Sequence, residues 1–163
     1  MSPTERATTL LELVVTLAVV ALAASLLLPR LGDARGWALD GAVRRLGDGV
    51  AWARERAILG GRPLRVAVDV DRGTWAIGAP ARDATGVVPD PSPVARPTAL
   101  PAGVRVRAVV ASGAPVVRGV AALDLDPAGD PLPARIELGD AHGRIARVVV
   151  PAGGGRPVVE GAR

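Results

Sequence analysis

The pattern of apolar and polar positions divides the chain into three parts, of which the first is the most apolar. Residues 8–28 are apolar almost without interruption, and Glu12 is the one carboxylate among them. About 20 apolar residues in a helix are long enough to span the ~30 Å hydrocarbon core of a bilayer. We therefore predict a transmembrane helix over residues 8–29. A carboxylate inside such a helix costs about 2.5–3.5 kcal/mol on insertion scales, so Glu12 is expected to have a function.

The second part, residues 30–61, carries an amphipathic helical pattern. Apolar residues recur there at steps of three and four, at Leu39, Val43, Leu46, Val50, Ala53 and Ala57. This stripe predicts that the helix continues and packs one face on the following domain. Several glycines oppose the prediction, because each weakens a helix by about 1 kcal/mol relative to alanine. Gly60 and Gly61 are a stop signal and predict the end of the helix.

The third part, residues 62–163, reads as short strands separated by turns. Asp71-Arg72-Gly73 predicts a hairpin between strands at 64–70 and 74–78. Residues 79–103 contain six prolines and are expected to form a long extended loop. Further strands are predicted at 104–110, 116–126 with a break at Gly119, 134–138, 144–150 and 158–159. With no second helix, this order predicts an α+β fold in which antiparallel sheets pack against the long N-terminal helix.

Composition and charge argue against several classes of function. The net charge is +4, all basic residues are arginine, and they are scattered along the chain. Scattered arginines indicate a solvated surface more than a nucleic-acid footprint. The only aromatic residues are three tryptophans, which leaves no stacking platform for single-stranded nucleic acid. The absence of cysteine excludes disulfides, thiol catalysis and zinc–thiolate sites.

No motif in the third part predicts catalysis, a cofactor or a metal. The run from Asp124 to Gly129 half-matches a calcium loop, but Ala128 replaces a ligand and Arg135 replaces the bidentate glutamate. A turn rich in aspartate explains the run better. His142 lies in a predicted turn, and Ser112 lacks the context of a nucleophile elbow. We therefore predict that the protein is not an enzyme and has no cofactor.

Three ordinary interpretations of the N-terminal stretch are open. A secretory signal peptide would use the small residues Ala21, Ala23 and Ala24 as its cleavage site, but Glu12 would then lie inside the hydrophobic region. A plain signal anchor also leaves Glu12 without a role. A simple membrane-anchored periplasmic domain predicts no processing at all.

The residues Thr9-Leu10-Leu11-Glu12-Leu13-Val14-Val15 resemble the prepilin motif of type IV pilins and type II secretion pseudopilins. The resemblance implies a leader at residues 1–7, removed by a prepilin peptidase between Ala7 and Thr8, and methylation of the new N-terminus at Thr8. Glu12 then falls at the fifth position of the mature chain, and Pro29 lies where the family often has a proline that bends the helix. The family usually has glycine before the cut and phenylalanine after it, so Ala7 and Thr8 depart from its pattern.

The resemblance also implies a role for Glu12 in subunit assembly. Cleavage would create an α-amino group one helical turn away from the carboxylate, on the same helix face. In the family, the carboxylate meets the N-terminal amine of a neighbouring subunit. A pair of buried opposite charges offsets a desolvation cost that neither charge could bear alone, and it sets the register between subunits.

The remaining sequence resembles the GspH/FimT group of minor pseudopilins. The resemblance is carried by the helix end at 53–61 and by the segments 123–129, 136–138, 145–150 and 155–156. It implies a structural subunit of the periplasmic pseudopilus of a type II secretion system, anchored once in the bacterial inner membrane with its C-terminal domain in the periplasm. The implied partners are other pseudopilins, the prepilin peptidase and secreted protein cargo.

The alternative within this resemblance is a FimT-like minor type IV pilin that binds DNA during uptake. Its DNA contacts would be Arg156 and Arg163 near the C-terminus. One arginine in the Gly155-Arg156-Pro157-Val158 segment gives only a small phosphate footprint. Salt-sensitive DNA binding that is lost in Arg156→Ala would distinguish this alternative from a role in export.

Overall fold

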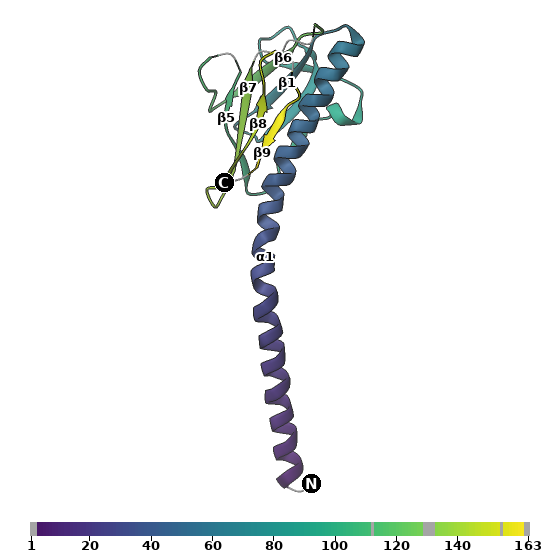
Figure 1. The fold of residues 1–163 in the computed structure, drawn as a ribbon. Coiled ribbons are helices and arrows are strands. Elements are labelled where there is room, and N and C mark those ends of the chain that lie inside the picture. Colours follow the sequence, from purple (N-terminus) through teal and green to yellow (C-terminus); the bar gives the residue numbers. More distant parts are fainter. Residues whose placement is uncertain (1–2, 112, 129–132, 154, 162–163) are drawn as a thin grey trace. The chain divides into compact units, whose positions relative to one another are not determined.

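The computed structural model describes residues 3–111, 113–128, 133–153 and 155–161, with the side chains of residues 12–23, 25 and 37 onward (Figure 1). The chain divides into two compact units, Met1–Trp37 and Ala38–Arg163. Helix α1 (Pro3–Gly60) begins in the first unit and ends in the second. Among the helices of the described part, none is long and apolar enough to cross a membrane.

The end of α1 follows from a glycine in the left-handed conformation. Gly61 has φ of 57°, a conformation that favours glycine because it has no Cβ. The N–H of Arg62 donates to the carbonyl of Ala57 at 3.2 Å, and the N–H of Gly61 donates to the carbonyl of Ile58 at 3.3 Å. This pair of hydrogen bonds is a Schellman motif. The predicted stop at Gly60-Gly61 is confirmed.

The first sheet has five antiparallel strands in the order β3-β2-β1-β6, with β4 also paired to β2. Its central hairpin joins β1 (Leu64–Asp69) to β2 (Thr74–Pro80), as predicted. The other strands are β6 (Val120–Leu125) and two short strands, β3 (Val87–Pro89) and β4 (Thr98–Ala99). Both short strands and a 3₁₀ turn, η1 (Pro93–Ala95), lie inside 79–103, which the proline content had predicted to be only an extended loop.

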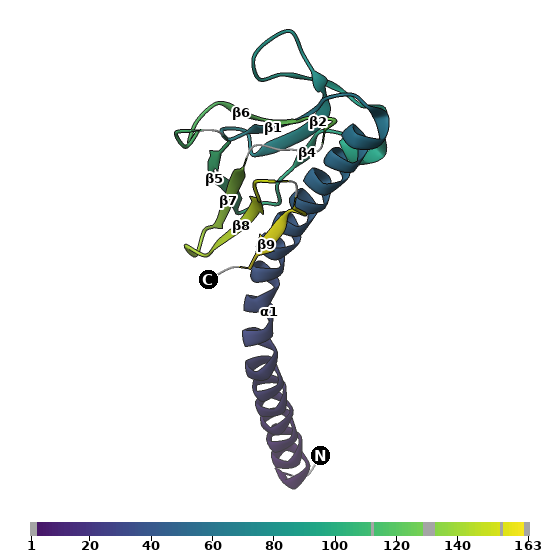
Figure 2. The same ribbon diagram turned by 45° about the horizontal axis from the view of Figure 1, so that its top comes forward.

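The second sheet has four antiparallel strands in the order β5-β7-β8-β9. They are β5 (Val104–Val110), β7 (Ala134–Asp140), β8 (Ile145–Val150) and β9 (Val158–Glu160). Figures 1 and 2 both show β9 at the edge of this sheet, beside α1. The break at Gly119 that was predicted within 116–126 also occurs. Gly119 has φ of 76°, β6 begins after it, and Val116 before it pairs with Val109 of β5.

The core of the second unit lies between α1 and the inward faces of both sheets. The six residues of the predicted helical stripe are all buried within it: Leu39, Val43, Leu46, Val50, Ala53 and Ala57. They contact a cluster that includes Val66 and Ile77 from the first sheet and Ile136 and Val148 from the second. The α+β fold with antiparallel sheets packed on the N-terminal helix is confirmed.

Two glycines of α1 are required by close packing. A Cβ on Gly49 would lie 2.7 Å from Cη2 of Trp75, and a Cβ on Gly47 would lie 2.9 Å from a methyl group of Val159. Both distances are shorter than ordinary van der Waals contact. Gly41, in contrast, has open space around its Cβ position. The helix therefore uses glycine at positions 47 and 49 to bring β2 and β9 close to its axis.

Candidate assembly interface

The N-terminal part of α1 is apolar on every side. Seven large apolar side chains of its described residues are each more than half exposed within this chain, and they are Leu13, Val14, Val15, Leu17, Val19, Val20 and Leu22. The hydroxyl of Thr16 donates to the carbonyls of Glu12 and Leu13, and the hydroxyl of Ser25 donates to that of Leu22. A helix that is apolar all round, with its hydroxyls bonded to its own backbone, is suited to burial against other helices or lipid.

The predicted processing residues lie within α1, but most of their surroundings are outside the described residues. Ala7, Thr8 and Pro29 are helical, and nothing is described of their side chains. Glu12 is exposed and has no cationic partner among the described residues. Cleavage, methylation, the bend at Pro29 and the pairing of Glu12 stay predictions. The same holds for the transmembrane segment 8–29, because the side chains of residues 8–11, 24 and 26–29 are outside the described part.

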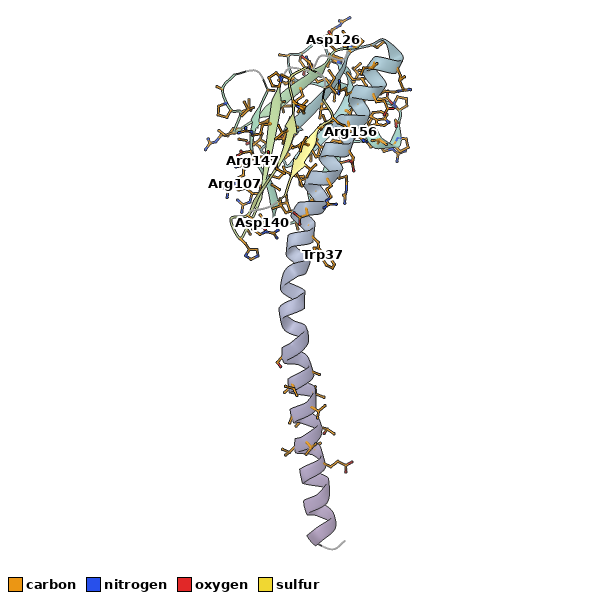
Figure 3. All side chains as sticks on the ribbon, viewed as in Figure 1. Trp37, Arg107, Asp126, Asp140, Arg147 and Arg156 are labelled. Atoms are coloured by element: carbon orange, nitrogen blue, oxygen red, sulfur yellow. The ribbon has the colours of Figure 1, made fainter. Side chains whose placement is uncertain are left out.

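The C-terminal strand lies along the second half of α1 and leaves two hollows beside it. Val159 packs against Gly47, and Nη1 of Arg54 donates to the carbonyl of Gly155 at 2.9 Å. One hollow, of about 520 Å³, is lined by Asp40, Val43, Arg44, Asp48, Val159 and Gly161. The other, of about 390 Å³, is lined by Ala51, Arg54, Glu55, Ile58, Leu59, Arg156 and Pro157. Arg156 therefore lies beside α1 (Figure 3), whereas Arg163 is outside the described residues.

The outer face of the second sheet carries a cross-strand ion-pair ladder. Nε of Arg147 on β8 donates to Glu137 on β7 at 2.8 Å, and its Nη1 lies 4.0 Å from Glu160 on β9. The hydrogen bond with Glu137 raises the pKa of Arg147 above its usual value, and the charge of Glu137 acts in the same direction. Exposed ion pairs contribute little to stability, so this ladder mainly fixes the alignment of the strands.

Sequence reasoning missed a buried arginine in the centre of the first sheet. Arg65 on β1 is only 8% exposed. Its guanidinium binds the carboxylate of Asp124 on β6 through two hydrogen bonds, of 2.6 and 3.1 Å. Its Nη1 donates to the carbonyls of Asp83 and Gly86, both at 3.3 Å. Arg65 therefore holds the connection between β2 and β3 against the outer face of the sheet.

The partners of Arg65 explain why it remains charged in this position. The hydrogen bond with Asp124 raises the pKa of Arg65, against the opposing effect of burial. Bidentate pairs of this geometry are among the stronger hydrogen bonds in proteins. The sequence signal that could have found the site is a charged residue within the apolar strand Leu64–Asp69, combined with an aspartate at the matching position of β6.

The aspartates that half-matched a calcium loop serve the fold. Asp124 binds Arg65, and the side chain of Asp126 accepts a hydrogen bond from the N–H of Ala128 at 2.7 Å. The second contact is the aspartate turn that the sequence predicted. His142 is exposed in the turn between β7 and β8, where its N–H donates to Asp140.

Residues 42–155 match the sequence model of a family described as type II transport protein GspH. The chain belongs to the GspH family. Comparison with curated proteins gave no significant match. The GspH match confirms the predicted family, and it confirms the predicted function of a type II secretion pseudopilin at the level of the family. None of the comparisons favours the DNA-binding alternative.

The fold of this GspH-family chain is similar to those of solved minor pseudopilins. One is the structure of the minor pseudopilin EpsH from the type II secretion system of Vibrio cholerae, with 17% identity, a TM-score of 0.60, and coverage of 76% of this chain and 96% of that one. A crystal structure of EpsH from the same system has 15% identity and a TM-score of 0.63, with coverage of 78% of this chain and 96% of that one. The solution structure of Escherichia coli GspH has 16% identity and a TM-score of 0.56, with coverage of 78% of this chain and 91% of that one. At these identities the likeness concerns the fold.

Proposed function

We propose that this chain is a minor pseudopilin, a structural subunit of the pseudopilus through which a type II secretion system exports proteins. The observation that carries the proposal is the match of residues 42–155 to the GspH family. The folds of minor pseudopilins from two bacteria support it. No catalytic step is part of this function, and the chain acts through assembly with other pseudopilins.

The proposal places the chain in the bacterial inner membrane as a single-pass protein. Residues 8–29 cross the membrane, the leader of residues 1–7 lies in the cytoplasm, and the β-rich domain of residues 62–163 lies in the periplasm, where it meets secreted cargo. The all-round apolar surface of residues 13–22 supports this arrangement, because such a surface needs lipid or neighbouring helices around it. Pro29 bends the helix as it leaves the membrane.

Processing prepares the N-terminus for assembly. The prepilin peptidase cuts between Ala7 and Thr8, and the α-amino group of Thr8 is methylated. Glu12 then pairs with the N-terminal amine of a neighbouring pseudopilin. The exposed carboxylate of Glu12 and its lack of a cation among the described residues support a partner from another chain.

Intact-mass measurement and N-terminal sequencing of the membrane-extracted protein test the proposal. We expect a mature chain that begins at Thr8 and carries a methyl group. Deletion of the peptidase gene should leave residues 1–7 attached, and this is the matched control. A chain that begins near Ala24, or one that is never cut in cells with the peptidase, would contradict the proposal.

Replacement of Glu12 tests the pairing. Glu12→Ala removes an insertion cost of about 2.5–3.5 kcal/mol, so membrane insertion should be unchanged or improved. Assembly should nevertheless fail, because the neighbouring amine loses its counter-charge. Crosslinking to other pseudopilins and secretion of cargo measure assembly, and Thr16→Val, one turn away, is the control that should assemble normally. Normal assembly of Glu12→Ala would contradict the pairing.

A further inference from the structure

The last turns of α1 expose apolar side chains on the flank opposite the core. Ile58 and Leu59 are the two residues after Ala57, the last buried residue of the helical stripe, yet Ile58 is 45% exposed and Leu59 is 79% exposed. Within the described residues, most of the Leu59 side chain is therefore open to solvent. Large apolar side chains that are exposed together indicate a binding surface more often than isolated ones do.

A hollow lies on each side of this exposed turn. The first is the 390 Å³ hollow that Ile58, Leu59 and Pro157 line together with Arg156. The second, of about 340 Å³, lies toward β2 and β3 and is lined by Arg56, Arg62, Pro63, Val88, Pro89 and Asp90, among others. Leu59 therefore stands at the edge of one hollow, and the exposed Val88 lines the other. We refer to Ile58, Leu59, Arg56, Arg62 and Arg156 as the helix-end surface.

The three arginines of the helix-end surface outnumber the carboxylates that line the same hollows, which are Glu55 and Asp90. Arg56, Arg62 and Arg156 are exposed, and none of them forms an ion pair with another described residue. Arg65 and Arg147, in contrast, bind carboxylates of the same chain. A binding partner that presents carboxylates beside an apolar residue would complement this surface in both charge and polarity.

We propose that the helix-end surface binds an acidic segment of another subunit of the same secretion apparatus. The segment places an apolar side chain against Ile58 and Leu59 and its carboxylates against Arg56, Arg62 and Arg156. The inference rests on the proposed function, since that function supplies the partner. It adds a contact made by the end of α1, separate from the helix packing that residues 8–28 would provide.

The composition of the surface favours a protein over a nucleic acid as the partner. Arginine and large apolar residues together are typical of the centres of protein interfaces. A phosphate backbone would leave the exposed side chains of Leu59 and Ile58 without an apolar contact.

Site-specific photo-crosslinking tests the proposal with the full-length processed chain. The sequence contains no cysteine, so a single introduced cysteine carries a benzophenone label at one known place. We would label Leu59→Cys, Val117→Cys as an exposed control on another segment, and Leu17→Cys as a reporter of helix packing. Each labelled protein is mixed in detergent with the purified other pseudopilins of its own system.

The proposal expects the Leu59 label to crosslink one pseudopilin with at least tenfold higher yield than the Val117 label. The crosslinked peptide should contain aspartate or glutamate beside an apolar residue. Arg56→Glu combined with Arg62→Glu should reduce the Leu59 yield at least tenfold and leave the Leu17 yield unchanged. The unchanged Leu17 yield shows that the N-terminal helix still packs on its partners, and an unchanged melting temperature shows that the charge-reversed domain is folded. Leu59→Ser with a label at Ile58→Cys gives a second test without charge reversal.

The three labels separate the possible failures. Crosslinking from Leu17 but no excess from Leu59 over Val117 would overturn this inference and leave the proposed function standing. No crosslinking from any label would overturn both. Duplex DNA is tested in parallel by gel shift: DNA binding that is lost on charge reversal, without crosslinking from Leu59 to any pseudopilin, would make the surface a phosphate site and overturn the inference.

Discussion

Replacing Gly49 by alanine should destabilise the domain, whereas the same change at Gly41 should stabilise it. Both glycines lie inside α1, where alanine is favoured over glycine by about 1 kcal/mol. At Gly41 nothing lies within 4 Å of the added Cβ. At Gly49 the added Cβ would lie 2.7 and 2.8 Å from two ring carbons of Trp75, a core residue that is only 4% exposed.

The difference between the two variants isolates the packing cost. The helix-propensity gain is common to both, so it cancels in the comparison. Forcing an extra carbon into a filled core costs about 1–3 kcal/mol. Gly49→Ala should therefore be about 1–3 kcal/mol less stable than Gly41→Ala, which for a domain of this size corresponds to a melting temperature lower by about 3–10 °C.

Thermal and urea unfolding of a soluble segment that begins at Gly36 measures this difference. The segment contains the whole compact unit Ala38–Arg163 and every buried side chain of the described core. Tryptophan fluorescence gives an independent signal, because the ring of Trp75 must move in Gly49→Ala. If Gly49→Ala proved as stable as Gly41→Ala, the close packing of α1 on β2 would be refuted.

Two further pairs of variants test the core and the buried arginine. Arg65→Met should cost about 2–3 kcal/mol of unfolding free energy, because charge-assisted hydrogen bonds are lost. Arg147→Met should cost clearly less, because the ion pairs of Arg147 are exposed to solvent. Equal costs in urea unfolding would contradict the role of Arg65. Leu46→Ala should cost about 2–5 kcal/mol through the cavity that it leaves in the core. Leu59→Ala should change the same measurement by less than about 0.5 kcal/mol, and a large loss there would show that Leu59 is buried.

The helix and its buried face could be predicted because they depend on local periodicity. Leu39, Leu46 and Val50 repeat with the period of an α-helix, and a helix that repeats in this way can bury only one face. The end of α1 was predictable for the same reason, since it depends on local hydrogen bonds, from Gly61 to Ile58 and from Arg62 to Ala57. The family resemblance then connected these elements to an assembly function.

What could not be predicted depends on residues that are distant in sequence. The cost of a glycine in a helix is visible in the sequence, but the reason for Gly47 and Gly49 lies in side chains of β9 and β2. Arg65 occupies an alternate position of a strand and therefore reads as a surface residue until the pairing of β1 with β6 places Asp124 opposite it. The exposure of Leu59 likewise depends on which strands cover the end of α1.

The position of β9 has a consequence for how the domain matures. The backbone of Gly155 bonds to Arg54 across 101 positions of sequence, and Val159 fills the space left by Gly47. Helix α1 is thus completed by a strand that is distant from it in the sequence. Contacts of such long sequence separation form late and slow folding. Until β9 docks, the second sheet ends at β8 and Gly47 lacks its contact with Val159, so a partly folded domain would present an unfinished edge beside α1.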